Sequence, residues 1–278
     1  MSEIFKKVNI SGRFDVSNSL PIFVIAGPCV MESEDHVMFM AEELKKITER
    51  LKIHFVFKSS FDKANRTSIR SARGVSIDVG CKIFEKVKKT FDVPTITDVH
   101  ETYQIDIVKD IVDVLQIPAF LSRQTDLLIA AGKSGKIINV KKGQFMAPDD
   151  MKNVAEKISS TGNEKILLCE RGACFGYNRL VNDMTALPIM EATGYPVVFD
   201  ATHSVQTPGG NGTCSGGHRE FVETVARAAT AVGVAGLFFE VHDNPDQAPC
   251  DGPNMVYLSK FEQLLSNLQK IDSLIKNL

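Results

Sequence analysis

The sequence has no long apolar run, no closely spaced cysteine pair and no large excess of charge of either sign. Its first residues, MSEIFKKVNISGRFDV, lack the apolar stretch of a signal peptide. No segment approaches the roughly 18 consecutive apolar residues of a membrane span. A formal net charge of −2 argues against a nucleic-acid partner, which would favour a basic stripe. We therefore expect a cytoplasmic protein that binds neither membrane nor nucleic acid.

The six cysteines, at 29, 81, 169, 174, 214 and 250, are scattered, and no two of them form a CxxC pair. In a reducing compartment such cysteines are mostly buried thiols, with metal binding or catalysis as a minority role. A chain of 278 residues buries roughly 75% of the surface that it exposes when unfolded. Folding therefore requires neither a disulfide nor a structural metal.

Short apolar runs recur along the chain, and segments with helical periodicity separate them. Most of the runs are apolar on both faces, as in a parallel sheet covered by helices. They are IFVIAG (22–27), FVFKSS (55–60), PTITDV (94–99), VDVLQI (112–117), KIINVK (136–141), KILLCE (165–170), PVVFDA (196–201) and GLFFEV (236–241).

Eight strand–helix units with no spare domain predict an α/β protein with a (β/α)8 TIM barrel, a usual architecture at this length. The alternative is a doubly wound open sheet. Against it, IAGPCVMES after the first run lacks the GxGxxG dinucleotide fingerprint, and polar residues follow nearly every run. The sequence also shows no internal repeat, low-complexity tract or linker. We expect one domain over residues 1–278, with a short N-terminal β-hairpin in about 1–20 capping the barrel bottom.

Polar side chains gather where the predicted strands end, and in a barrel these ends all face one mouth. After the first four strands come Cys29, then Lys58, Ser60, Lys63, Asn65 and Arg66, then Asp98, and then Gln116, Pro118 and Arg123. After the last four come Lys141 and Gln144, then Arg171, then Asp200, His203 and Gln206, and finally Glu240 and Asp251.

Six of these residues are cations, although the chain as a whole is slightly acidic: Lys58, Lys63, Arg66, Arg123, Lys141 and Arg171. Arginine and lysine are the usual partners of phosphate and carboxylate oxygens. A local excess of positive charge favours bound anions. Substrates that carry two phosphates and one carboxylate would match the number of cations. The alternative is that each cation is solvated or pairs with a nearby acid.

Cys29, His203, Glu240 and Asp251 form a mixed thiol, imidazole and carboxylate set that suits a divalent ion such as Zn²⁺ or Fe²⁺. The four residues lie far apart in the chain, so no short zinc motif joins them. The first, seventh and eighth strands are nevertheless neighbours in a closed barrel. His242 and Cys250 are competing ligands in the same region.

The segment SVQTPGGNGTCSGGHREF, after the seventh strand, is rich in glycine at 209, 210, 212, 216 and 217. Glycine gives such a segment conformational freedom, so a lid over 207–218 is one interpretation. An ordinary surface loop is the other.

Six of these segments together resemble the 3-deoxy-manno-octulosonate-8-phosphate synthase family over about residues 20–260. They are IAGPCVMES, KSSFDKANRTS, QIPAFLSRQTDLL, NVKKGQF, FDATHSVQ and FFEVHDNPDQAPCDGP. KANR is the specific part, because the sister family that makes a seven-carbon sugar acid from erythrose 4-phosphate carries a KPRT-like segment there. The sister activity is the alternative enzyme.

The resemblance assigns roles to individual residues. It implies that Lys63, Lys141 and Arg171, with Lys58 and Gln116 alongside, bind phosphoenolpyruvate. It implies that Asn65 and Arg66 hold the aldose and its phosphate, with Ser60, Asp98 and Pro118 nearby, and we also assign Gln206 to the substrate site. Arg123 matches a position that reaches a neighbouring subunit's site in family assemblies.

Cys29, His203, Glu240 and Asp251 match the ligands of the metal-dependent subclass, whose ion we expect to be Zn²⁺, Fe²⁺ or Mn²⁺. The metal-independent subclass has asparagine in place of Cys29.

The resemblance implies that phosphoenolpyruvate and arabinose 5-phosphate condense with water to 3-deoxy-manno-octulosonate 8-phosphate and phosphate, a step of lipopolysaccharide biosynthesis. Lys63 is the candidate acid near the developing alkoxide, and a metal-bound group near Asp251 is the candidate base. The ion would either polarise the aldehyde oxygen or activate the water. The resemblance also suggests a homotetramer. A barrel that binds sugar phosphates without catalysis is the non-enzyme alternative.

Overall fold

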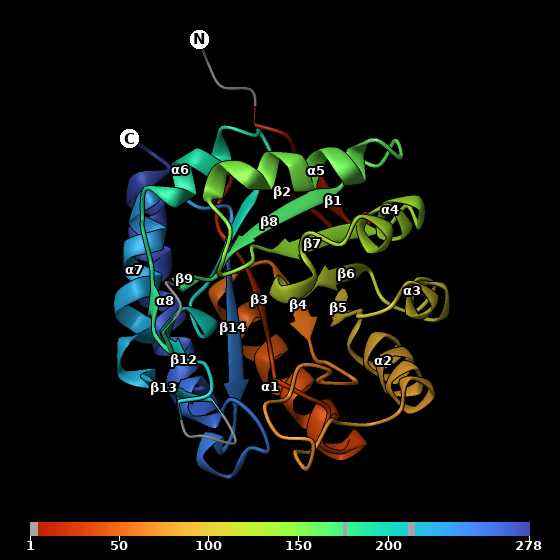
Figure 1. Ribbon diagram of the computed structural model, residues 1–278. Helices are drawn as coiled ribbons and strands as arrows, with labels where there is room; N and C mark the ends of the chain where they lie inside the picture. Colours follow the sequence, from red (N-terminus) through yellow and green to blue (C-terminus); the bar gives the residue numbers. More distant parts are fainter. Residues whose placement is uncertain (1–4, 175–176, 211–214) are drawn as a thin grey trace.

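A closed barrel of eight parallel strands forms the centre of the molecule (Figure 1). The computed structural model describes residues 5–174, 177–210 and 215–278. The strands are hydrogen-bonded in the order β11–β8–β7–β6–β5–β4–β3–β14, and β11 pairs with β14 to close the ring. They are β3 (Phe23–Gly27), β4 (Phe55–Lys58), β5 (Thr95–Asp98), β6 (Val114–Ile117), β7 (Ile137–Lys141), β8 (Ile166–Glu170), β11 (Val197–Asp200) and β14 (Gly236–His242). The barrel prediction is confirmed, and the open sheet is excluded.

Helices alternate with the strands and cover the barrel's outer face (Figure 1). In the first of them, Val37, Met40, Ala41 and Leu44 form one buried stripe, and the Ser33 side chain caps the start by accepting from the His36 N–H. The helices are α1 (Glu34–Leu51), α2 (Ile77–Phe91), α3 (Thr102–Val108), α4 (Thr125–Lys133), α5 (Met151–Ser159), α6 (Ala186–Glu191), α7 (Val222–Val232) and α8 (Leu258–Ile275). Across the described ranges, no helix combines the length and apolarity needed to cross a bilayer.

Alternate residues of each barrel strand face opposite sides, and this divides the core in two. In β3, Val24 and Ala26 pack in the large cluster that includes the apolar helix side chains, whereas Phe23 and Ile25 belong to a separate cluster inside the barrel. The inner cluster also takes Val56, Ile96, Val114, Ile137, Val198 and Phe238. Two residues further along these same strands stand Lys58, Asp98, Gln116, Asn139, Asp200 and Glu240. The barrel interior is therefore apolar toward the N-terminal ends of the strands and polar at the C-terminal mouth.

An N-terminal hairpin closes the other end of the barrel. Strands β1 (Val8–Ile10) and β2 (Phe14–Val16) pair antiparallel. Val8, Ile10 and Val16 are buried in the inner cluster with the strand residues. Figure 1 shows this hairpin at the end opposite the arrowhead of β14. The predicted cap of the barrel bottom is confirmed, and the single-domain organisation of residues 1–278 stays a prediction.

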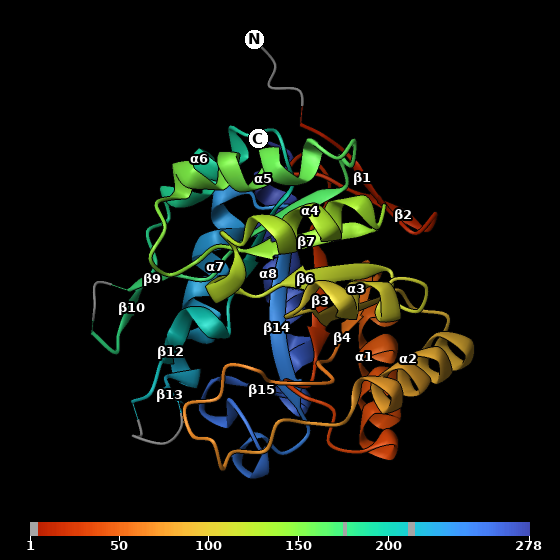
Figure 2. The ribbon, with the colours of Figure 1, turned by 45° about the vertical axis from the view of Figure 1, so that its right-hand side comes forward.

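Short strands in the loops extend the opposite, C-terminal end, where Figures 1 and 2 both place β12 and β13. These strands are β9 (Ala173–Cys174), β10 (Leu180–Val181), β12 (Gln206–Thr207), β13 (Gly216–Gly217) and β15 (Val256–Tyr257). The antiparallel pair β12–β13 lies within the glycine-rich segment. Residues 211–214, which belong to the predicted lid, lie outside the described residues, and the lid stays a prediction.

Gly27 ends β3 where the backbone of β4 passes very close. A Cβ at this position would lie 1.8 Å from the carbonyl oxygen of Lys58. We expect Gly27→Ala to push β3 and β4 apart and to lower the free energy of unfolding by about 3 kcal/mol or more, the upper end for overpacking. Urea unfolding measures it. Gly12→Ala is the control for backbone strain alone, because Gly12 has a positive φ and no atom lies within 4 Å of an added Cβ. It should lower the free energy of unfolding by less. Equal stability of Gly27→Ala and wild type would contradict this role for Gly27.

Candidate active site

A cavity of about 370 Å³ lies at the C-terminal mouth of the barrel, within the size range of small-molecule sites. Most of the residues that the sequence nominated line it. These are Lys63, Asn65, Arg66, Asp98, Gln116, Pro118, Lys141, Gln144, Arg171, His203, Gln206 and Asp251. Segments from nearly every part of the chain thus contribute to one hollow, as the barrel topology requires.

Four further nominated residues lie directly behind this lining. Lys58 is fully buried, and its Nζ donates to the Cys29 carbonyl at 2.8 Å and to Glu240 Oε1 at 3.0 Å. The Ser60 hydroxyl donates to Asp98 Oδ2. Lys58, Ser60, Cys29 and Glu240 therefore support the cavity wall from below.

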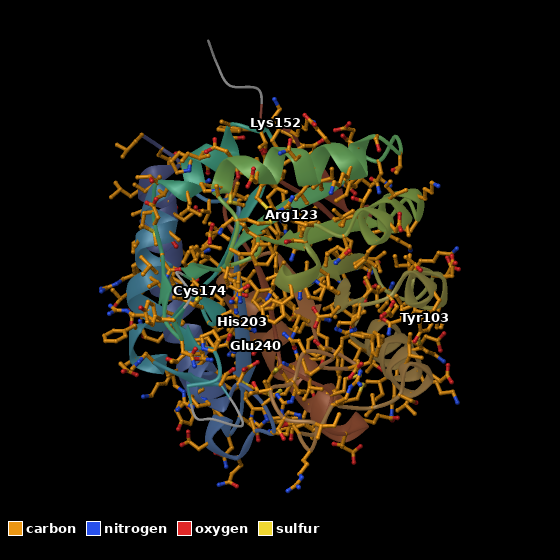
Figure 3. All side chains as sticks on the ribbon, viewed as in Figure 1. Tyr103, Arg123, Lys152, Cys174, His203 and Glu240 are labelled. Atoms are coloured by element: carbon orange, nitrogen blue, oxygen red, sulfur yellow. The ribbon has the colours of Figure 1, made fainter. Side chains whose placement is uncertain are left out.

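Arg123 is placed differently from the other nominated cations. Its side chain is exposed, and it is not part of the cavity lining found among the described residues. Figure 3 shows it apart from His203 and Glu240. Arg123 therefore lies outside this cavity lining, and its assignment to a substrate site, including one of a neighbouring subunit, stays a prediction.

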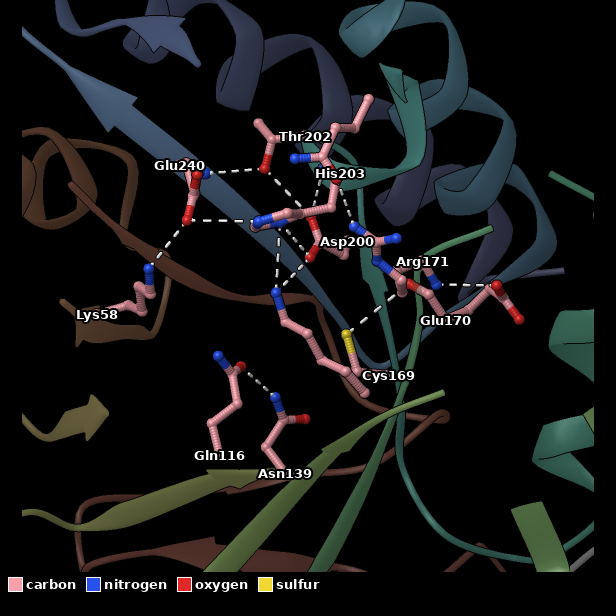
Figure 4. A network of polar contacts seen from close by, with 12 residues as sticks. Lys58, Gln116, Asn139, Cys169, Glu170, Arg171, Asp200, Thr202, His203 and Glu240 are labelled. Atoms are coloured by element: carbon pink, nitrogen blue, oxygen red, sulfur yellow. Dashed lines mark hydrogen bonds and ion pairs between the residues drawn. The ribbon is translucent and has the colours of Figure 1, made fainter. Parts of the chain in front are cut away.

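Asp200, at the end of β11, orients the imidazole of His203. Its Oδ2 lies 2.7 Å from His203 Nδ1 and 2.6 Å from Lys141 Nζ, and its Oδ1 accepts from the His203 backbone N–H at 2.9 Å. Figure 4 shows His203 between Asp200 and Glu240. Because Nδ1 faces a carboxylate, Nε2 is the nitrogen presented to the other candidate ligands, the usual arrangement behind a metal-binding histidine.

Glu240, on β14, is the central carboxylate of the site. Its Oε1 lies 3.0 Å from Lys58 Nζ, 3.7 Å from Lys63 Nζ and 3.6 Å from His203 Nε2. Its backbone N–H donates to the Thr202 hydroxyl. Burial raises the pKa of Glu240, but the charges of Lys58, His203 and Lys63 outweigh that effect and hold the pKa well below its usual range. Glu240 is therefore a carboxylate at neutral pH.

Asp251 completes the rim through contacts on both of its oxygens. Oδ1 accepts from Gln206 Nε2 at 2.8 Å, and Gln206 Oε1 in turn accepts from Arg171 Nη2 at 3.0 Å. Oδ2 accepts from Cys29 Sγ at 3.3 Å and lies 3.9 Å from His203 Nε2. Gln206 thus links a candidate metal ligand to a candidate substrate cation.

The four nominated ligands fit a divalent transition-metal ion. Ligand atoms of His203, Glu240 and Asp251 lie within 4.8 Å of one another, and Asp251 forms a second such group with Cys29 and Cys250. Glu240 Oε2 is buried and finds no hydrogen-bond partner in the described parts of the chain, so it has capacity for a cation. Cys250 remains a competing ligand because its Sγ is 2.6 Å from that of Cys29. His242 instead groups with Glu32 and His36.

The expected excess of positive charge is only partly present. Lys58, Lys63 and Lys141 form ion pairs with Glu240, Asp98 and Asp200, so the alternative of pairing with nearby acids holds for these three lysines. For Arg66 and Arg171, no carboxylate ion pair is found among the residues described. Arg66 Nη2 donates to the Pro249 carbonyl, and Arg171 Nη1 is buried without a hydrogen-bond partner in the same set. The arginines therefore retain hydrogen-bonding capacity for anions.

Asp98 and Lys63 keep opposite charges in the cavity wall. Burial raises the pKa of Asp98, but Lys63 and Lys58 outweigh it and hold the pKa far below its usual range. Burial likewise disfavours the charged amine of Lys63, yet the nearby acidic groups, Asp98 and Glu240 among them, keep its pKa well above the ordinary value. Lys63 is therefore an ammonium group at neutral pH and has a proton to donate.

Several polar residues of the network were not nominated as site residues. Asp200 stood among the strand-end residues without a role, and Thr202 and Asn139 were not considered. Asn139 Nδ2 donates to Gln116 Oε1 at 2.9 Å, and the Thr202 hydroxyl donates to Asp200 Oδ1 at 3.1 Å. Asn139 stands two residues before Lys141 on one face of β7, so the period-two pattern of that strand was a usable signal.

Asp200→Asn should weaken metal binding without unfolding the barrel. The amide replaces the carboxylate that orients His203, and removal of such a partner typically costs roughly 10–100-fold in metal affinity. Equilibrium dialysis against Zn²⁺ measures the change. Asp106→Asn, on exposed α3 and paired only with Lys109 among the ion pairs found, is the matched control. Unchanged Zn²⁺ affinity in Asp200→Asn would contradict this role for Asp200.

Comparisons with known proteins agree with this geometry. Residues 8–277 match the model of the DAHP synthetase I family. The chain is 58% identical to "2-dehydro-3-deoxyphosphooctonate aldolase" of Brucella ovis and of Brucella anthropi, and 55% identical to the protein of that name from Bartonella tribocorum. Each match covers 96% of this chain and 96% of the relative. The chain therefore belongs to the DAHP synthetase I family and, within it, to the 2-dehydro-3-deoxyphosphooctonate aldolases.

Proposed function

We propose that the protein condenses phosphoenolpyruvate with arabinose 5-phosphate and water, giving 3-deoxy-manno-octulosonate 8-phosphate and inorganic phosphate. In this reaction C3 of phosphoenolpyruvate joins the aldehyde carbon, water adds at C2, and cleavage of the C–O bond expels phosphate. The observation that carries the proposal from the geometry is Arg171, a buried guanidinium in the cavity wall whose Nη1 has no hydrogen-bond partner among the described residues. The name shared by the relatives supports the eight-carbon product.

Phosphoenolpyruvate would bind at the deepest cations of the cavity. Lys141 and Arg171 are both buried, and Lys63 stands beside them in the lining. A carboxylate and a phosphate need several donors held at fixed positions, and Asp200 and Gln206 already hold Lys141 and Arg171. Such preorganised cations offset the repulsion between two anionic substrates and fix their relative orientation.

Arabinose 5-phosphate would bind nearer the solvent. Asn65 is exposed and Arg66 half-buried in the lining, and Arg66 is free of ion pairs with described acids. The Asp98 carboxylate accepts hydrogen bonds from Ser60 and Gln116. Because these contacts fix its position, it could accept a further hydrogen bond from a sugar hydroxyl. The two substrates would thus meet at Lys63.

Lys63 would donate the proton that the aldehyde oxygen gains when the C–C bond forms. Its raised pKa keeps it protonated, and Asp98 at 3.5 Å and Glu240 at 3.7 Å hold its ammonium group in place. We propose Cys29, His203, Glu240 and Asp251 as ligands of a divalent ion, which when bound supplies Lewis-acid polarisation of an oxygen or an activated water. Asp251, on the rim of the cavity, is the candidate to take the proton from the water that adds at C2.

Phosphate release from phosphoenolpyruvate tests the proposal, with arabinose 5-phosphate and erythrose 4-phosphate offered in parallel. We expect release only with the five-carbon sugar phosphate. Preference for erythrose 4-phosphate would assign the chain to the sister activity, which the KANR segment and the relatives' names do not favour. Release with neither aldose would support a non-catalytic binding protein instead.

We also propose a cytoplasmic homotetramer that serves lipopolysaccharide synthesis. Support for assembly comes from Phe120 and Phe145, which are 53% and 59% exposed. Phe120 also lines the cavity. Large exposed aromatic side chains of this kind are typical of interfaces. Sedimentation equilibrium of the full chain measures the assembly, and a monomer would contradict it.

A further inference from the structure

A second group of metal-ligating side chains lies where β3 leads into α1 and where β14 ends. Glu32 and His36 come from the first segment, and His242 and Asp243 come from the second. One ligand atom each from Glu32, His36 and His242 lies within 4.8 Å of the other two. His242 is buried, His36 half-buried and Glu32 exposed, so the group joins the barrel rim to the solvent.

Polar atoms of these residues converge on one another. His242 Nε2 lies 2.8 Å from Glu32 Oε1, and the ring centroids of His36 and His242 are 4.6 Å apart. Asp243 Oδ1 lies 3.0 Å from both His36 Nε2 and His242 Nδ1. Two imidazoles and two carboxylates therefore share one small volume.

His36 provides an independent indication of a ligand. Its Nδ1 is buried and has no hydrogen-bond partner among the described residues, although the ring stands beside another imidazole. A buried nitrogen without a partner costs stability, so such groups in folded proteins usually have a bound water, ion or side chain to satisfy them. His36 also belongs to the group with Glu32 and His242, whose ligand atoms offer electron pairs, so a cation is a fitting partner for the group.

We infer that Glu32, His36 and His242 form a second metal site, which takes a borderline divalent cation such as Zn²⁺ or Co²⁺. Imidazole nitrogen with carboxylate oxygen is the ligand set that these ions accept. The site differs from the candidate active site because it contains no cysteine. Its two segments also carry Cys29 and Glu240, so a bound cation would join the two segments that supply those residues and stabilise the folded mouth by mass action.

Cobalt titration of the full-length, chelator-treated protein tests the inference, because Co²⁺ distinguishes the two sites. Thiolate-to-cobalt charge transfer reports the site that contains Cys29, whereas the second site contributes only ligand-field absorption. We expect wild type to bind two equivalents per chain. His36→Gln and Glu32→Gln should each bind one and keep the full charge-transfer band. Glu34→Gln, which changes a neighbouring exposed acid, is the matched control and should bind two.

One equivalent in wild type, or two in both His36→Gln and Glu32→Gln, would overturn the inference. The Glu32 variant changes an exposed side chain, so it gives a result even if the His36 variant does not fold. If wild type shows no charge-transfer band or no phosphate release, that result would count against the proposed active site instead. Failure of the second metal site and failure of the proposed function can therefore be told apart.

Discussion

Lys63→Met should remove turnover and leave the barrel folded. The substitution keeps a long side chain but deletes the ammonium group that lies 3.5 Å from Asp98 and 3.7 Å from Glu240. Loss of a general acid typically costs roughly 10²–10⁴-fold in rate. The loss should be in kcat more than in KM, because Lys141 and Arg171 remain to bind phosphoenolpyruvate. Steady-state phosphate release measures both constants, and circular dichroism checks the fold.

Two comparisons make this result specific. Lys152→Met alters an exposed lysine on α5 and should leave kcat unchanged. Lys63→Arg keeps the positive charge, but a guanidinium does not readily donate its proton. Compared with Lys63→Met, it should therefore restore substrate binding more than turnover. Wild-type kcat in Lys63→Met would show that the proton comes from another group.

Chelation should abolish wild-type activity, and Cys29→Asn should remove most of the metal affinity without unfolding the chain. The change deletes the one thiol among the four proposed ligands, so we expect a loss greater than the roughly 10–100-fold seen when only a ligand's hydrogen-bond partner is removed. Any residual activity in Cys29→Asn should respond little to chelation. Metal content by mass spectrometry and phosphate release before and after Zn²⁺ addition measure these effects.

The pH dependence of metal binding provides a further check on Cys29. Burial, with a smaller contribution from Cys250, holds the pKa of the Cys29 thiol well above its ordinary value. A thiol must lose its proton to bind a cation, so the apparent affinity of wild type should rise with pH. Cys29→Asn should show a weaker rise, and Cys81→Ser, on α2, should behave as wild type. Full activity of wild type after exhaustive chelation would contradict the four-ligand site.

The barrel could be predicted from the sequence because local pattern and global fold agree. In β3, for example, the apolar residues Val24 and Ala26 meet the helices while Phe23 and Ile25 meet the interior, so both faces of the strand had to be apolar. The hairpin followed from the alternation in VNISGRFDV, which places Val8 and Val16 opposite each other.

The pairing of charges across the mouth could not be predicted in the same way. Lys58 and Glu240 are 182 residues apart, and only the closed ring brings them to 3.0 Å. The position of Asp200 in the sequence places it at a strand end. It does not reveal that the carboxylate contacts both His203 and Lys141. Arg123 is exposed outside the cavity lining, because a position after a strand end does not decide which way a loop side chain points, and its predicted role stays untested.

The N-terminal hairpin determines the route that reactants and products take. Because Val8, Ile10 and Val16 fill the N-terminal end of the barrel, reactants and products must pass through the C-terminal mouth, where the described residues line the cavity. Under the proposed assignment, the molecule held at buried Lys141 and Arg171 must arrive before the one held at the outer Asn65 and Arg66. A compulsory order of substrate binding would then be a property of the closed barrel itself.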